Sequence, residues 1–137
     1  MKTIFILELL LFLSSFTLDN RSYRLDDIRF EINDDKLTDE HSRQLETIVR
    51  TIRTMIKEEH KKTFTLWING NSDSIEKNAK KLSTNRAEGV RDKLINLGLT
   101  DGKLVTRGYG KKRPMTDSKT EAHRKINARV DFQIELE

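Results

Sequence analysis

The hydrophobic pattern is most regular between residues 45 and 56, where it predicts a long amphipathic helix. Apolar side chains recur there at the spacing of one helix face, as Leu45, Ile48, Val49, Ile52, Met55 and Ile56. Thr38 is suited to the N-cap, and Asp39 and Glu40 follow in the first turn, where the helix dipole favours acidic side chains. We expect this helix to end near Glu59.

A second apolar stripe predicts another helix from about Asn78 to Leu97. Its members are Ala79, Leu82, Ala87, Val90, Leu94 and Leu97. Gly98 follows directly, and glycine is the common residue after a helix end because it adopts positive φ at low cost.

Four segments are predicted as strands, and they are 28–32, 64–68, 103–107 and 130–136. In 28–32, 64–68 and 130–136 the apolar residues recur at every second position, as in half-buried strands. A polar loop at 71–77 leads into the second helix, and a basic segment at 111–123 with a short helical turn at 121–126 precedes the last strand. The order β-α-β-α-β-β, with a loop or short helix before the final strand, predicts an α+β fold. It is a two-layer α/β sandwich with both helices on one face of a mixed four-stranded sheet.

The amino-terminal 18 residues differ from the rest of the chain. Lys2 precedes an apolar run from Thr3 to Leu18 that is interrupted by Glu8. This run is shorter than the about 20 residues of a membrane span, so it favours a signal peptide and leaves an N-terminal membrane anchor as the alternative. Residues 19–27 form a short linker and 28–137 form one domain. Both alternatives predict export to the periplasm or cell envelope.

Composition narrows the function classes. The 137 residues include no cysteine, which excludes disulfides, thiolate metal sites and a cysteine nucleophile. The net charge of +4 fits a solvated basic surface or affinity for an acidic polymer. Aromatic residues do not interleave with the basic ones, so nucleic acid is not an expected partner. Since the chain lacks hydrolase, phosphate-loop and zinc-protease motifs, we expect no enzymatic activity, no cofactor and no metal site.

Asp73 and Arg86 are the candidate functional pair. Asp73 follows the end of a strand, where open α/β sheets hold ligands, and Arg86 flanks the apolar stripe of the second helix. Taken singly, the aspartate fits a turn and the arginine fits a side chain lying over the core. Facing each other, they offer an acceptor for an ammonium group and a bidentate donor for a carboxylate, which suits a zwitterionic amino acid.

The motifs around this pair resemble the OmpA-like C-terminal domain, a family that includes peptidoglycan-associated lipoproteins and the periplasmic domains of MotB-type flagellar stators. The similarity covers about residues 28–136. It is carried by Gly-Asn-Ser-Asp at 70–73, Leu-Ser-x-x-Arg-Ala-x-x-Val at 82–90, Arg-Gly-Tyr-Gly at 107–110 and Asn-x-Arg-Val at 127–130.

The resemblance implies non-covalent binding of peptidoglycan through the free end of diaminopimelate in the stem peptide. Asp73 would take its ammonium group and Arg86 its carboxylate. The resemblance extends the site to Asn71, Ser72, Asn78, Arg124 and Arg129. The domain would tether a membrane or envelope component to the cell wall.

The chain departs from the family pattern in the loop and in the last motif. Asn71 and Ser72 replace the usual His-Thr, and the loop after Asp73 is about two residues shorter. Ala79 stands where asparagine is customary, with Asn78 displaced by one position, and Ala128 replaces an arginine. A second interpretation is a membrane-anchored, MotB-like subunit of an ion-driven motor or transport complex. Envelope protein partners and a homodimer are left open.

Overall fold

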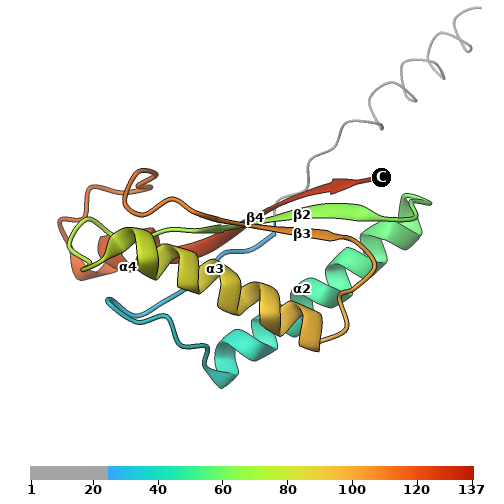
Figure 1. Ribbon diagram of the computed structural model, residues 1–137, viewed down its shortest axis with the longest axis horizontal. Helices are drawn as coiled ribbons and strands as arrows, with labels where there is room; N and C mark the ends of the chain where they lie inside the picture. Colours follow the sequence, from blue (N-terminus) through green and yellow to red (C-terminus); the bar gives the residue numbers. More distant parts are fainter. Residues whose placement is uncertain (1–24) are drawn as a thin grey trace, which may run out of the picture.

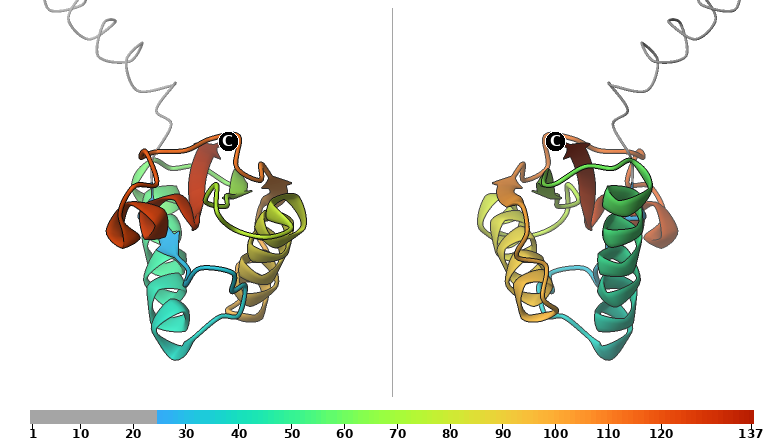
Figure 2. Two further views of the ribbon diagram at one scale, coloured as in Figure 1. Left: turned by 90° about the vertical axis from the view of Figure 1, so that its left-hand side faces the viewer. Right: turned by 90° about the vertical axis from the view of Figure 1, so that its right-hand side faces the viewer.

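The computed structural model describes residues 25–137, so the predicted leader or anchor and residues 19–24 of the linker lie outside them. The described chain forms a four-stranded sheet in the order β1-β4-β2-β3, with helices α2 and α3 side by side on one face (Figures 1 and 2). The elements are β1 (Ile28–Arg29), α2 (Asp39–Glu58), β2 (Phe64–Gly70), α3 (Ala79–Asn96), β3 (Lys103–Gly108), α4 (Glu121–Asn127) and β4 (Arg129–Leu136). The predicted α+β sandwich is thereby confirmed. No helix within this described part is long and apolar enough to span a membrane.

The sheet is mixed because its strands run in different directions. β2 is parallel to β3, whereas β4 lies antiparallel to both β2 and β1. In register, Ile68 pairs with Thr106 on one side and Phe132 on the other. The last strand of the chain is therefore an inner strand.

Helix α2 begins where its capping signal predicts. The Thr38 hydroxyl accepts a hydrogen bond from the backbone N–H of His41, and the His41 ring Nδ1 accepts one from the Thr38 backbone N–H. The other ring nitrogen, Nε2, lies 2.7 Å from the Arg29 carbonyl oxygen. His41 therefore fastens the start of α2 to strand β1.

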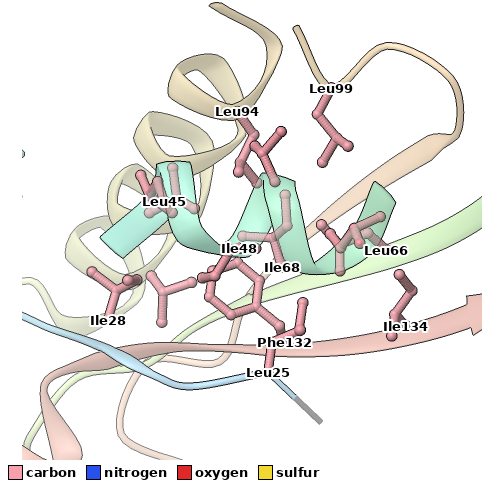
Figure 3. Close-up of a cluster of buried hydrophobic side chains, with 14 of the residues drawn as sticks. Leu25, Ile28, Leu45, Ile48, Leu66, Ile68, Leu94, Leu99, Phe132 and Ile134 are labelled. Atoms are coloured by element: carbon pink, nitrogen blue, oxygen red, sulfur yellow. The ribbon is translucent and has the colours of Figure 1, made fainter. Parts of the chain in front are cut away.

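One hydrophobic core fills the space between the sheet and the two long helices (Figure 3). Leu45 and Ile52 from α2 and Leu94 from α3 have no exposed surface, and Leu66 and Ile68 meet them from β2. This burial confirms the predicted apolar face of α2 and the alternation of β4, whereas Ala79 and Leu82 of the predicted α3 stripe are only half-buried.

Helix α3 approaches the sheet closely at two paired glycines. Gly70 and Gly108 lie opposite each other at the ends of β2 and β3. A Cβ atom at Gly70 would lie 1.8 Å from the Ser83 carbonyl oxygen, and one at Gly108 would lie 2.1 Å from the Thr84 hydroxyl. The first turns of α3 can rest on the strands only because both positions lack a side chain.

The strand predicted for 28–32 is shorter than expected, because β1 ends at Arg29. The Phe30 N–H still bonds the Ala128 carbonyl, but the chain then turns, with a positive φ of 60° at Asn33. The carbonyl groups of Glu31 and Asp34 instead accept hydrogen bonds from the Arg86 guanidinium. The backbone carbonyls after Phe30 are therefore bonded by the buried Arg86 side chain of α3 and not by a neighbouring strand.

Candidate functional site

The candidate site lies at the end of the domain where β2 and β3 finish. Loops 71–78 and 109–120 meet there beside α4 (Figure 1). The two loops are joined by backbone hydrogen bonds from Ser72 N–H to Gly110 O and from Tyr109 N–H to Gly70 O. The Ser83 hydroxyl adds a bond to α3 by accepting from the Gly110 N–H. The frame around the site is therefore built from both loops and one helix.

Asp73 is buried, and protein groups surround its carboxylate. One oxygen, Oδ1, accepts from the Asn127 amide at 2.8 Å and from the Ser118 hydroxyl. The other, Oδ2, accepts from the Ile75 backbone N–H at 3.0 Å. Burial raises the pKa of Asp73, but the hydrogen bonds from Ser118, Asn127 and the backbone lower it by a larger amount. The pKa therefore lies below its usual range.

Asn127 organises the loop that covers Asp73. It is the last residue of α4, and its side-chain oxygen accepts from the backbone N–H groups of Met115 and Thr116. Its amide nitrogen donates to Asp73 and also lies 3.1 Å from the Ser118 hydroxyl. This asparagine belongs to the Asn-x-Arg-Val motif, but the predicted site residues near it are the arginines Arg124 and Arg129.

Arg86 is fully buried, so the interpretation of a side chain lying over the core with an exposed head is wrong. Its Nε donates to the Asp34 carbonyl, and its terminal nitrogens donate to the carbonyls of Asn71 and Glu31. The guanidinium also lies 5.2 Å from the centre of the Phe30 ring. The remaining donors go to a carboxylate outside the predicted set of site residues.

That carboxylate is Glu76, which makes a bidentate ion pair with Arg86. Glu76 Oε1 lies 2.9 Å from one terminal nitrogen, and Oε2 contacts the other. Glu76 also accepts from the backbone N–H groups of Asp73 at 2.7 Å and Asn33 at 2.8 Å. Both partners of the ion pair are completely buried. In the sequence, Glu76 is marked only by its position three residues after Asp73, and a glutamate there is also typical of an ordinary polar loop.

The structure brings Asp73 and Arg86 to the same end of the domain without joining their side chains. Among the described residues, the ion pair of Arg86 is with Glu76. Glu76 bonds both the Asp73 backbone and the Arg86 side chain, so it links the two. These three ionisable groups together carry one negative charge when all are ionised.

Ser72, Asn78 and Arg124 border this cluster. The Ser72 hydroxyl donates to the Ala79 carbonyl at the start of α3, and Arg124 donates to the Ser118 carbonyl. Asn78 occupies the N-cap of α3 with a positive φ of 50° and makes no side-chain cap bond. Ser72 and Arg124 thus hold the loops, whereas Asn78 is exposed.

Asn71 and Arg129 belong to a second network, centred on Asp131. The Asn71 amide donates to Asp131 at 3.0 Å, and Arg129 makes an ion pair with Asp131 at 3.2 Å. Arg129 also donates to the Arg113 carbonyl. Asn71 reaches the first cluster through its backbone carbonyl, which accepts from Arg86. Within residues 25–137, no group of three or more His, Cys, Asp or Glu side chains is arranged to hold a metal ion.

A comparison of the sequence with known proteins finds relatives in bacterial envelopes. The chain is 41% identical over 73 residues to outer membrane porin F of Pseudomonas aeruginosa, covering 51% of the chain and 21% of that protein. It is 39% identical over 67 residues to outer membrane protein A of Bordetella avium, covering 47% of the chain and 34% of that protein. The chain therefore spans only a minor part of the curated relatives it matches.

The fold is shared with solved envelope proteins. The peptidoglycan-associated lipoprotein from Burkholderia pseudomallei superposes with a TM-score of 0.62 at 22% identity, covering 80% of this chain and 89% of that one. The C-terminal domain of Helicobacter pylori MotB gives a TM-score of 0.68 at 22% identity, covering 82% and 86%.

The family model for the OmpA family matches residues 29–128, which include both Asp73 and Arg86. This match spans the sheet, both long helices and the loops of the candidate site. It also agrees with the expectation that the chain is not an enzyme. The chain belongs to the OmpA family.

Proposed function

We propose that this domain binds peptidoglycan non-covalently at the end of the sheet that carries Asp73 and Arg86. The observation that carries the proposal is the Asp73 carboxylate, which is held ionised by hydrogen bonds inside a domain of the OmpA family. An ionised, desolvated carboxylate is suited to an ammonium group. The diamino acid of the stem peptide ends in such a group.

Ser118 marks where the ammonium group would bind. Its hydroxyl donates to Asp73 Oδ1 from a loop whose neighbouring residues Asp117 and Lys119 are exposed. Ser118 has a positive φ of 61°, which is uncommon for a residue other than glycine. We infer that the ligand ammonium replaces this hydroxyl on Asp73, and that the loop 111–120 moves aside when it does.

The surface around the site supports an acidic polymer as ligand. Exposed lysines lie on both loops and on the first turn of α3, and these are Lys77, Lys80, Lys81, Lys111, Lys112 and Lys119. The first turn of α3 has no acidic residue. Stem peptides carry free carboxylates, which these cations attract over the about 8 Å that physiological salt allows.

The biological role follows from this binding. The domain would tether an envelope component to the cell wall in the periplasm, with other envelope proteins as partners. The alternative of a membrane-anchored, MotB-like subunit depends on residues 1–18. Sequencing the amino terminus of the mature protein separates the two, since a start near residue 19 excludes the anchored form.

Retention on purified sacculi tests the proposal. We expect the wild-type domain to sediment with sacculi, and Asp73→Asn to lose retention about tenfold or more because the ammonium loses its charged partner. Glu88→Gln is the matched control, because Glu88 is an exposed α3 carboxylate. Thermal unfolding of each variant separates lost binding from lost folding. Equal retention of folded Asp73→Asn and wild type contradicts the proposed site.

A further inference from the structure

The guanidinium group of Arg86 already binds a carboxylate of the same chain. Arg86 has five N–H donors, the most an arginine can offer. Three bond the backbone carbonyls of Glu31, Asp34 and Asn71, and two bond the Glu76 carboxylate. No N–H donor of Arg86 therefore remains for a ligand carboxylate.

Glu76 is also held firmly in place. Its two oxygens accept four hydrogen bonds, two from Arg86 and one each from the backbone N–H groups of Asn33 and Asp73. The side chain has no exposed surface. A ligand carboxylate would have to break all four bonds or else lie against a like charge in a desolvated site, and both are costly.

The net charge of Asp73, Glu76 and Arg86 also disfavours a ligand carboxylate. Asp73 and Glu76 are two carboxylates against the single guanidinium of Arg86, and the Asp73 hydrogen bonds come from neutral donors. This balance attracts one ammonium group. It disfavours an ammonium group that brings a carboxylate with it.

We propose that Glu76 is a specificity-determining residue. It takes the position that the ligand carboxylate would occupy on Arg86, so the site prefers a stem-peptide diamino acid whose terminal carboxyl is amidated over the same residue as free acid. The neutral carboxamide adds no like charge, and its N–H groups can donate to the carboxylates. This inference rests on the proposed binding of the diamino acid at Asp73.

The test compares two synthetic probes by calorimetry. They are the tripeptide L-alanyl-γ-D-glutamyl-meso-diaminopimelate as free acid and the same peptide with the terminal carboxyl of its diaminopimelate side chain amidated. We expect the wild-type domain to bind the amidated probe about tenfold tighter or more, since like-charge juxtaposition is strongly unfavourable. Glu76→Gln removes the charge at nearly constant volume and should abolish or reverse this preference. Glu88→Gln, the same change at an exposed site, should keep it.

Acetate provides a second readout that does not depend on peptidoglycan. Glu76→Ala leaves a carboxylate-sized space beside the buried guanidinium. Acetate should therefore raise the melting temperature of Glu76→Ala above that in equal chloride, and should leave wild type and Glu76→Gln unchanged. This measurement also covers the case in which Glu76→Ala is too unstable to bind peptide.

The outcomes separate the two proposals. Equal affinity of the wild type for both probes, or tighter binding of the free acid, overturns the role of Glu76 while leaving peptidoglycan binding intact. An unchanged preference in folded Glu76→Gln overturns it as well. If the folded wild type binds neither probe nor sacculi, the proposed function fails. In that case acetate rescue alone still decides whether Glu76 fills a carboxylate position.

Discussion

Replacing Arg86 with methionine should destabilise the domain severely. The substitution keeps an apolar stem of similar length but removes the buried positive charge, which leaves the Glu76 carboxyl group without its partner in a site with no exposed surface. It also removes the donors to three buried or partly buried carbonyls, of Glu31, Asp34 and Asn71. Breaking a buried ion pair by deleting one partner costs about 3–5 kcal/mol.

That loss is large for a domain of this size. Single domains have unfolding free energies of about 5–15 kcal/mol, so Arg86→Met removes about a fifth or more of that stability. At about 3–5 °C per kcal/mol, the melting temperature should fall by roughly 10–25 °C. The consequence for function is direct, because Arg86 variants that lose ligand binding must first be shown to be folded.

Urea unfolding followed by fluorescence measures this effect. The single tryptophan, Trp67, lies in β2 and reports on the sheet. Arg50→Met is the matched control, since Arg50 is exposed on α2 and should change the unfolding free energy by no more than about 0.5 kcal/mol. The double variant Glu76→Met/Arg86→Met should be more stable than Arg86→Met alone, because no uncompensated charge remains buried.

Two results would refute the reasoning. One is an Arg86→Met domain within about 1 kcal/mol of wild type, which would mean that leaving Glu76 without its partner costs little. The other is a double variant whose loss equals the sum of the single losses, because residues in direct contact should be coupled.

Three further changes test other parts of the structure. Gly70→Ala places a Cβ against the Ser83 carbonyl, so urea unfolding should show a loss of about 1–3 kcal/mol or more. Leu45→Ala opens a cavity in the core and should cost about 2–5 kcal/mol in the same assay, whereas a loss under 1 kcal/mol would mean that the core collapses around it. Asp73 has a lowered pKa, so its ionised form contributes stability above the unfolded pKa near 3.8, and this is lost as pH falls through the folded value. The melting-temperature difference between wild type and Asp73→Asn should therefore shrink in acid, and a constant difference would contradict the pKa assignment.

The fold could be predicted from the sequence because its elements follow local patterns. The apolar face of α2, its Thr38 cap and the alternation of β4 each depend on neighbours a few residues apart. The apolar pattern of α3 is less regular than that of α2. Gly98 nevertheless predicts the end of α3, and it adopts a positive φ of 91° there. These patterns predict the elements correctly because the local conformational preference of each segment and the burial of its side chains favour the same structure.

The site could be predicted only in part, because its contacts join distant segments. Glu76 contacts Arg86 ten positions later and Asn33 far upstream, and neither spacing has a helical or strand period. The cover over Asp73 depends on Ser118, which lies in a loop without regular structure. No local pattern encodes these pairings, so they emerge only when the tertiary structure is known.

The position of β4 has a consequence for how the chain acquires its structure during synthesis. This strand is synthesised after β1, β2 and β3, yet it lies between β1 and β2, and Ile28 pairs with Val130. Neither the ladder of β1 nor one side of β2 can form until β4 has been synthesised. Such long-range pairing slows folding. A chain truncated before β4 should therefore fail to form the sheet.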